Sequence, residues 1–381
     1  MLFPHPIIGQ EKGIDAFNSY QLNKKHRKVK LTDLIQEVEF IRLQETPKSL
    51  LGNLYNVHIV GDKFVFAGDK LKGDIFVFDS QGKFVNRINR KGVSPGDYFS
   101  LTDIWIEGDL IAVFSSQRGI KRYRLNGDFV SESKLDLRAG HAFGKANQYF
   151  LNLQSTVTVD EYINGNRSPE QVNYDVAQLD ADMNILEMHL PNTRKVGGFI
   201  SGYSIFFDYK ESLVFCKPMS DTVYKYFENK FVPLVQFDFG DYWHWDHYDA
   251  LDGNIMQGLR ASNKAYSIRP KIGSRYIYSY TQYGSGAKNL ELWHLIDRKN
   301  SEIVLVDLNR SSKKGAFDLQ FSHWESDDTF YAFLPSLDAV GLVTEATRKN
   351  WSFRGGTNLE EIASSENPVL VRIKVKDFSK D

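Results

Sequence analysis

The sequence predicts an all-β fold, a six-bladed β-propeller with four antiparallel strands in each blade. Three observations lead to this prediction. A pattern of short strands and glycine turns recurs at intervals of roughly 45 residues. Aromatic residues make up 14% of the chain, which suits half-buried strands, and the chain is 381 residues long. Six four-stranded blades of roughly 50 residues would use about 300 of them.

The repeat is clearest in the first two blades. IFVFDSQGKFV (75–85) and IKRYRLNGDFV (120–130) each contain a strand, a polar glycine turn and a Phe-Val pair that opens the next strand. A second matching pair lies upstream, NVHIVGDKFVFAGD (56–69) and DIWIEGDLIAVFSS (103–116). Gly-Asp and Asn-Gly turns favour antiparallel hairpins because glycine and asparagine accept positive φ. Each unit therefore predicts four antiparallel strands.

Four further units follow with less regular lengths and bring the count to six. The third covers YFLNLQSTVTV (149–159) and NYDVAQLDADMNILEMHL (173–190), with a longer segment between its strands. The fourth, fifth and sixth units cover residues 204–240, 272–308 and 317–334. The sixth unit supplies only two strands before the pattern breaks.

The last blade is interrupted and is completed from the other end of the chain. Residues 335–366 predict a partly helical insertion, in which Thr357 and Glu360 have the spacing of a capping box. VLVRIKV (369–375) predicts the third strand of this blade, and VEFIRL (38–43) predicts the fourth. A closure of this kind joins the ring and removes an exposed sheet edge.

Length and composition limit the domain organisation and the class of function. We expect residues 31–381 to form one propeller domain, preceded by an N-terminal tail at residues 1–30. Hydrophobic residues at 42% and charged residues at 25% are typical of a globular chain. A formal net charge of −1 gives no electrostatic reason to expect nucleic acid or an anionic membrane as partner.

The single cysteine and the N-terminus limit the chemistry and the targeting signals. Cys216 alone excludes a disulfide framework and a multi-cysteine metal site, and its apolar surroundings, SLVFC, predict a buried strand thiol. No stretch has the length of a transmembrane helix. MLFPHPIIGQ lacks the basic region and the long apolar region of an intact signal peptide.

Several segments resemble a known family. DLIQEVEFIRLQETPKSLLGNL (33–54), FVFDSQGKFVNRINRKGVSPGDY (76–98), SDTVYKY (220–226) and ENPVLVRIKVKDF (366–378) are similar to six-bladed, NHL/TolB-like propeller proteins of Bacteroidetes. The resemblance implies the propeller fold and an extracytoplasmic location, with a lipid anchor in a full-length precursor. Most members of that family have no assigned activity, so the resemblance implies little about function.

The loops predict where a ligand would bind. In a propeller, the loops between second and third strands and the connections between blades gather on one face, where binding sites are commonly found. The run DYWHWDHYD (241–249) is the predicted connection between blades four and five. The candidate ligand-binding residues on this face are Trp243, His244, Trp245, Asp246, His247, Arg90, Arg118 and Tyr98.

Two interpretations of the run DYWHWDHYD remain open. Metal binding needs three or more converging ligands, and adjacent side chains of an extended segment point to opposite faces, which disfavours a metal site. Trp243 and Trp245 would share one face of such a segment and could grip a glycan. Alternatively, both pack in the gap between two blades. For Arg90 and Arg118 the alternatives are an anionic ligand and simple solvation or ion pairing.

Two motif matches fail on chemical grounds. GVSPG (92–96) has the spacing of a nucleophile elbow, but Pro95 has no backbone N–H to donate to an oxyanion. DADMN (180–184) begins like a calcium loop, yet Ile185 and Pro191 occupy the positions that need glycine and glutamate. We therefore predict no catalytic residue, no metal ligand and no cofactor.

The predicted function is binding rather than catalysis. We expect a non-enzymatic, monomeric, extracytoplasmic binding or scaffold propeller that holds a glycan, peptide or protein partner at its loop face. The alternative is a propeller hydrolase, lactonase or lyase with acids and histidines at the channel mouth, with or without a metal ion. Such an enzyme needs convergent residues on the innermost strands, where the sequence offers only the scattered His58, Asp103 and Asp318.

Overall fold

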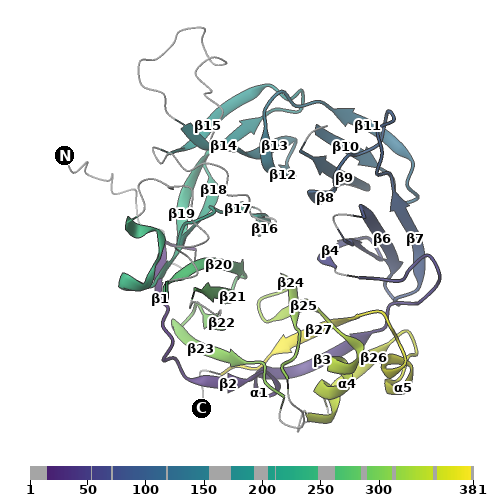
Figure 1. Ribbon diagram of the computed structural model, residues 1–381, viewed down its shortest axis with the longest axis vertical. Coiled ribbons are helices and arrows are strands. Elements are labelled where there is room, and N and C mark those ends of the chain that lie inside the picture. The colour runs from purple at the N-terminus through teal and green to yellow at the C-terminus, as the bar shows by residue number, and fades with distance from the viewer. Residues whose placement is uncertain are drawn as a thin grey trace.

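The protein is a six-bladed β-propeller, as predicted. The computed structural model describes residues 15–52, 54–69, 72–116, 119–153, 173–192, 205–210, 212–247, 262–284, 290–310, 315–345 and 350–378. Within these ranges six sheets of four or five strands form a ring around a central axis (Figure 1). The first strand of each blade lies nearest the axis.

Blades one to three contain four strands each, paired in chain order. Blade one consists of β4 (Tyr55–Val60), β5 (Lys63–Ala67), β6 (Asp74–Asp79) and β7 (Phe84–Asn89). Blade two consists of β8 (Asp103–Glu107), β9 (Leu110–Ser115), β10 (Gly119–Tyr123) and β11 (Phe129–Ser133). Blade three consists of β12 (Ala139–Lys145), β13 (Gln148–Leu153), β14 (Asn173–Leu179) and β15 (Ile185–Asn192).

Blades four and five each gain a fifth, outermost strand from the N-terminal part of the chain. Blade four consists of β16 (Phe206–Tyr209), β17 (Ser212–Cys216), β18 (Thr222–Phe227) and β19 (Lys230–Asp238), with β1 (Asn18–Gln21) outside. Blade five consists of β20 (Ala265–Ile272), β21 (Tyr276–Tyr283), β22 (Leu290–Asp297) and β23 (Glu302–Asp307), with β2 (Lys28–Lys30) outside.

The N-terminal segment is therefore part of the propeller, and the predicted tail at residues 1–30 is corrected from residue 15 onward. Strand β1 pairs in parallel with β19, and β2 pairs in parallel with β23. Tyr20 and Leu22 are buried against blade four. We call residues 15–34 the N-terminal strap; they end in the short helix α1 (Leu31–Leu34) and follow the outside of the ring (Figure 1).

The last blade closes the ring as predicted. It consists of β24 (Gln320–Trp324), β25 (Thr329–Leu334), β27 (Val369–Val375), β3 (Ile35–Ile41) and β26 (Trp351–Arg354). Strand β3 pairs antiparallel with β27, so the N-terminal part of the chain supplies the fourth strand. Strand β26 lies outside β3 and belongs to the predicted insertion.

The insertion contains two helices, α4 (Ser336–Glu345) and α5 (Leu359–Ala363). The predicted cap of α5 was wrong by one residue, because Asn358 rather than Thr357 is the N-cap. The Asn358 side chain accepts a hydrogen bond from the Glu361 backbone N–H at 3.0 Å. Thr357 instead donates to the Glu361 carboxylate at 2.8 Å, so a reciprocal polar contact still closes this helix start.

Aromatic side chains fill the gaps between neighbouring blades, which explains their abundance. Phe66 of blade one meets Phe333 of blade six edge to face, with ring centroids 5.5 Å apart. Tyr276 of blade five stacks on Trp324 of blade six at 6.0 Å. Twisted sheets diverge toward the outside of a ring, so large flat side chains suit the widening space between them.

Candidate functional site

The innermost strands enclose a cavity of about 480 Å³ at the axis of the ring. Residues of all six first strands line it, and it reaches the turns that follow these strands at Lys210, Ser274 and Glu325. The volume lies within the usual range of small-molecule sites, roughly 300–1,000 Å³. This is the face of the tight turns, whereas the sequence led us to expect the ligand on the opposite face.

The first strand of each blade carries at least one ionisable side chain. Four of these strands carry a basic residue and two carry an acid. These side chains include His58 (β4), Asp103 (β8), His141 (β12), Asp208 (β16), Lys271 (β20) and His323 (β24). All except His141 line the cavity, and we call these six residues and their cavity the channel site.

The two acids of the channel site have partners in the next blade. Asp103 is 6% exposed, and its carboxylate lies 3.0 Å from His141 Nδ1 and accepts the Ala142 backbone N–H at 3.1 Å. The Asp208 carboxylate accepts a hydrogen bond from Lys145 Nζ at 2.6 Å. These contacts join blade two to three and blade three to four, so they also fix the ring.

Three basic residues come from consecutive blades and form the opposite wall. Burial lowers the pKa of His58 to about 4, with Lys271 adding to the effect and Asp208 opposing it. Burial, together with His58 and Lys271, lowers the pKa of His323 to about 3. Burial also lowers the pKa of Lys271. Both imidazoles are therefore neutral at neutral pH.

One atom of this wall has unmet hydrogen-bonding capacity. His58 Nε2 is buried and has no hydrogen-bond partner in the described part of the chain. A buried polar atom without a partner costs roughly 1–3 kcal/mol, so a site of this kind favours a ligand or a water molecule. His323 is better supported: its ring stacks on Tyr331 at 5.4 Å and its Nδ1 lies 3.3 Å from Ser322 Oγ.

Two tryptophans pack closely against glycines in the walls of the channel site. A Cβ atom on Gly273 would lie 2.8 Å from the Trp324 ring, and one on Gly144 would lie 2.5 Å from Trp105 Nε1. Trp324 Nε1 also donates to the Lys271 carbonyl at 2.8 Å, which links blade six to blade five. Only glycine permits these approaches, so both positions help to define the shape of the cavity.

The structure places the run DYWHWDHYD in packing between blades. Strand β19 ends at Asp238, Gly240 has a φ of 53°, and two 3₁₀ turns follow, η1 (Gly240–Tyr242) and η2 (Trp245–His247). The segment is therefore not extended, and the shared face expected for Trp243 and Trp245 does not form. The two side chains are 3% and 1% exposed.

Contacts on both sides hold the two indoles in the core. Trp243 stacks on Phe239 at 5.0 Å, and Trp245 Nε1 donates to the Tyr266 carbonyl at 2.7 Å. Tyr20 of the N-terminal strap belongs to the same core cluster. A glycan platform needs exposed ring faces, so this arrangement favours the packing interpretation and offers a ligand no indole face.

The other residues of the run are divided between core and surface. His244 is buried edge-on against Trp245 at 4.9 Å, and burial lowers its pKa. Asp246 is exposed. The side chain of His247 and the last two residues of the run lie outside the part of the chain that the structure describes.

Two of the remaining predicted residues, Tyr98 and Arg90, lie in the connection from blade one to blade two. Tyr98 is fully buried; its hydroxyl donates to the Gly73 carbonyl at 2.5 Å and accepts the Arg90 backbone N–H at 3.1 Å. Arg90 itself is exposed and donates to the Gly127 carbonyl at 3.4 Å. Arg118 lies outside the described residues. Tyr98 thus anchors this connection, and a ligand role for Arg90 and Arg118 stays a prediction.

The sequence pointed to His58 and Asp103 but missed the other members of the channel site. It placed the innermost strand of blade six at Asp318, whereas β24 begins two residues later and brings His323 to the channel. The Asp318 backbone N–H instead bonds the Asp338 carboxylate at 2.7 Å. Among the described residues, no group of three or more His, Cys, Asp or Glu side chains has the geometry of a metal site.

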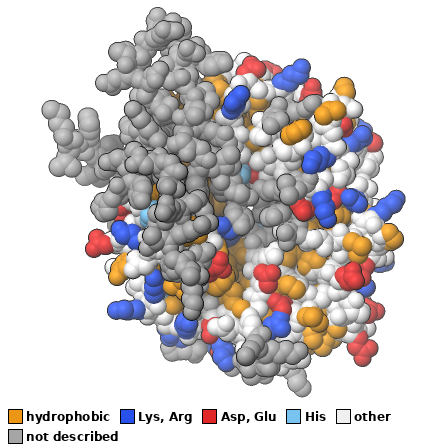
Figure 2. Space-filling view, viewed as in Figure 1, with side chains coloured by type: hydrophobic (Ala, Val, Ile, Leu, Met, Phe, Trp, Pro, Cys, Tyr) orange, Lys and Arg blue, Asp and Glu red, His pale blue; other side chains and the backbone are white. Residues whose placement is uncertain are grey.

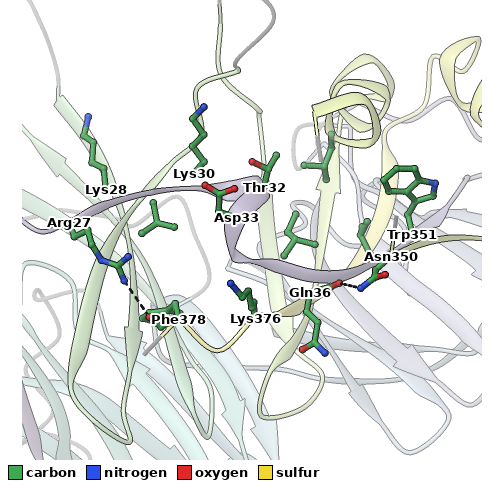
Figure 3. Close-up of a pocket in the computed structure, with 14 residues that line it drawn as sticks. Arg27, Lys28, Lys30, Thr32, Asp33, Gln36, Asn350, Trp351, Lys376 and Phe378 are labelled. Carbon is green, nitrogen blue, oxygen red and sulfur yellow. Dashed lines mark hydrogen bonds between the residues drawn. The ribbon is translucent and has the colours of Figure 1, made fainter. Parts of the chain in front are cut away.

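A second cavity of about 500 Å³ lies at the outer edge, between the N-terminal strap, α4, β26 and the C-terminal segment (Figure 3). Arg27 donates to the Phe378 carbonyl at 3.4 Å, and Asn350 donates to the Gln36 carbonyl at 3.0 Å. Lys28 and Lys30 extend away from these contacts and are exposed. The first hydrogen bond joins the strap to the C-terminal segment and the second joins the insertion to β3, which indicates a structural role for this edge.

On the face shown in Figure 2, the charges of the described residues do not separate into broad regions of one sign. Acidic and basic side chains are interspersed there. None of the described helices is both long and apolar enough to span a membrane. The channel site is therefore the concentration of ionisable groups that best fits a ligand.

A closed ring of six blades around a polar axial cavity defines the class of protein, a six-bladed β-propeller with a channel site. The chain belongs to the family described as "Domain of unknown function (DUF4934)", whose model matches residues 15–374. No curated protein matches the sequence.

Two solved structures illustrate the range of similarity. A protein from Bacteroides fragilis, named "Putative exported protein", is 16% identical with a TM-score of 0.69, over 95% of this chain and 100% of its own. Hsv2 from Kluyveromyces lactis is 13% identical with a TM-score of 0.33, over 77% of this chain and 79% of its own. At 16% identity the similarity to the Bacteroides fragilis protein supports the fold alone. The similarity to Hsv2, with its TM-score of 0.33, supports no conclusion about this chain.

Proposed function

We propose that this protein is a non-enzymatic, extracytoplasmic propeller that binds a small molecule, or the end of a glycan or peptide, in the channel site. The observation that carries the proposal is the convergence of ionisable side chains from five of the six blades around one cavity of about 480 Å³, with His141 of blade three bonded to one of them. Convergent polar groups in a concave site are the usual mark of a ligand pocket. The unpartnered His58 Nε2 supports the same conclusion.

The ring also supports a binding role through its rigidity. Neighbouring blades are joined next to the cavity by Asp103–His141, Lys145–Asp208 and the Trp324–Lys271 carbonyl contact. The Val57 backbone N–H donates to Ser322 Oγ at 2.8 Å and joins blade one to blade six. A preorganised wall binds without a large ordering cost, so affinity can come from few contacts.

A glycan and peptide array, followed by calorimetry on each hit, tests this proposal. Lys271→Met removes a charge from the channel site, and Arg90→Ala removes one from the loop face that the sequence favoured. Lys134→Met, on the exposed outside of blade two, is the matched control. We expect Lys271→Met to abolish binding while the other two variants bind normally. Loss of binding in Arg90→Ala alone would instead place the ligand on the loop face.

A second candidate function is hydrolase, lactonase or lyase activity in the same cavity. Two neutral imidazoles, His58 and His323, share the site with the Asp208 carboxylate, and neutral imidazole is the form that acts as a general base. The array hits and a panel of lactones would be incubated with the protein and followed by mass spectrometry. Turnover that His58→Gln abolishes would support this candidate over binding alone.

The proposed location and blade type follow from the resemblance described above. We propose an extracytoplasmic monomer, lipid-anchored in its precursor, with blades of NHL or TolB type; the name of the Bacteroides fragilis protein also describes export. Fractionation of cells that express the natural gene, combined with labelling by an alkyne fatty acid, tests the location and the anchor. Light scattering after size-exclusion chromatography tests the oligomeric state.

A further inference from the structure

We propose that the channel site takes a compact organic carboxylate, whose carboxylate group meets the wall formed by Lys271, His58 and His323 and whose binding takes up a proton. This inference rests on the proposed function and specifies the ligand class. It follows from how the partners of the six channel residues are distributed, from the composition of the cavity walls, and from the electrostatics of the basic wall.

Hydrogen-bonding demand in the channel site is concentrated on the basic wall. Asp103 is bonded to His141 and to a backbone N–H, and Asp208 is bonded to Lys145, so the acids already have donors. On the opposite wall, His58 Nε2 has no partner in the described part of the chain. A carboxylate oxygen at this wall accepts a hydrogen bond from the Nε2–H form of His58 and gives that buried atom a partner.

The three basic residues also act on one another through space. His58 and Lys271 both lower the pKa of His323, and Lys271 lowers that of His58 as well, beyond the larger effect of burial. An anion between them favours the charged forms of His58 and His323, which Lys271 disfavours. Because β4, β20 and β24 are first strands of consecutive blades, one small anionic group can serve all three side chains.

The walls favour a carboxylate on an organic body over inorganic phosphate. No arginine is among the described residues that line the cavity, and arginine is the usual bidentate partner of phosphate. Apolar side chains, including Ile59, Ile106, Phe207 and Trp324, form much of the remaining lining. Lys271 Nζ lies 6.0 Å from the centroid of the Phe207 ring, so charge and apolar surface are adjacent. A sugar acid or an aromatic acid presents both features in one molecule.

Proton uptake follows from the charge states. His58 and His323 are neutral at neutral pH, because their pKa values are about 4 and about 3. A bound carboxylate raises both pKa values, so affinity rises as the pH falls, by up to tenfold per pH unit for each imidazole that becomes protonated. The other charged groups that face this site are Asp103, Lys145, Asp208, Lys210, Lys271, Glu325 and Asp327.

Isothermal titration calorimetry with matched acids and neutral analogues tests the inference. The probes are D-glucuronate with D-glucose, and benzoate with benzamide, at pH 5.5, 6.5 and 7.5 in two buffers of different ionisation enthalpy. We expect at least one acid to bind and its neutral analogue not to bind, with affinity at pH 5.5 at least tenfold higher than at pH 7.5. Buffer-dependent heats should reveal proton uptake.

Variants connect the effect to the residues. Lys271→Met should abolish binding of the acid, and the double variant His58→Gln with His323→Gln should bind with an affinity that no longer varies with pH. Lys134→Met should behave as the unaltered protein. Equal binding of acid and neutral analogue, an affinity independent of pH, or no binding of either acid would overturn the inference. If the carboxylate inference fails, the array decides the proposed function. Array ligands whose binding Lys271→Met abolishes would still support binding in the channel site. If the array gives no such ligand, the proposed function is overturned as well.

Discussion

Replacing His323 with glutamine should make the protein less sensitive to acid. His323 is neutral in the folded protein down to a pKa of about 3, because burial, His58 and Lys271 disfavour its charged form. In the unfolded chain a histidine takes up a proton at about pH 6.5. The unfolded state therefore binds the proton more readily, and the free energy of unfolding falls as the pH drops below 6.5.

The size of the effect follows from the width of this window. Between the folded-state pKa of about 3 and the unfolded-state pKa of about 6.5, each pH unit changes the free energy of unfolding by about 1.4 kcal/mol. Protonation of His323 alone therefore lowers the free energy of unfolding by roughly 3 kcal/mol between pH 6.5 and 4.5. Above pH 6.5 its contribution no longer changes with pH. His58, with a pKa of about 4, acts in the same direction over nearly the same range.

Urea unfolding, followed by the fluorescence of the six tryptophans, measures this at pH 7.5, 6.5, 5.5 and 4.5. His323→Gln should lose roughly 3 kcal/mol less stability than the unaltered protein between pH 6.5 and 4.5. The difference at pH 7.5 reports lost packing alone and serves as the internal control. Adding His58→Gln should flatten the profile further. Parallel profiles for the variant and the unaltered protein would refute the account of His323.

Three further predictions concern stability and use the same urea assay. Tyr98→Phe should lower the free energy of unfolding by roughly 1–3 kcal/mol, because the Gly73 carbonyl loses its buried donor. Its control, Tyr242→Phe at an exposed position, should lower it by under about 0.5 kcal/mol. Gly273→Ala should destabilise the protein by roughly 1–3 kcal/mol, because the new Cβ atom would contact Trp324. Gly52→Ala should not destabilise it, because a Cβ atom there meets no atom within 4 Å. Equal effects of the two substitutions would contradict the packing argument. Deleting residues 1–22 removes two buried side chains from blade four and should cost roughly 3–6 kcal/mol; an unchanged unfolding midpoint would show that the strap contributes nothing.

The blades could be predicted from the sequence because their signals are local. Gly61 and Gly108 turn between first and second strands with φ values of 58° and 62°, as the Gly-Asp pairs indicate. The closing strand was recognisable because VEFIRL alternates and the last blade lacked a partner. By contrast, β1 and β2 are only four and three residues long and pair in parallel at an outer edge. Nothing within such short segments distinguishes them from a tail.

The run DYWHWDHYD shows where local reasoning fails. Its composition was compatible with a ligand platform and with packing of its aromatic side chains between two blades. Which of the two forms depends on the backbone conformation of the run. Gly240 adopts positive φ and starts a 3₁₀ turn, which rotates Trp243 and Trp245 into the gap between blades four and five. The glycine was visible in the sequence, but its effect on the direction of the following side chains depends on β20 and the strap, which pack against them.

The channel site was hidden for a different reason, since its members lie far apart in sequence and converge only through the ring. Finding them requires the register of every first strand, and an error of two residues in blade six replaced His323 with Asp318. The sequence also assigned binding to the loop face, because the loops and the connections between blades gather there. The first strands of all six blades line the axial cavity on the face of the short turns, so short turns do not exclude a binding site.

The strap and the channel site are physically connected, which relates closure of the ring to ligand binding. Asp15, at the start of the strap, accepts hydrogen bonds from Tyr209 and from Lys210, two residues that line the channel cavity. Arg298 of blade five donates to the same Tyr209 hydroxyl at 2.5 Å, so the rim between blades four and five is held by one network. Partial burial of Asp15 opposes its ionisation, but these hydrogen bonds lower its pKa and keep it charged. A chain without the strap should therefore bind its ligand more weakly even where it remains folded, because the strap fixes one side of the site.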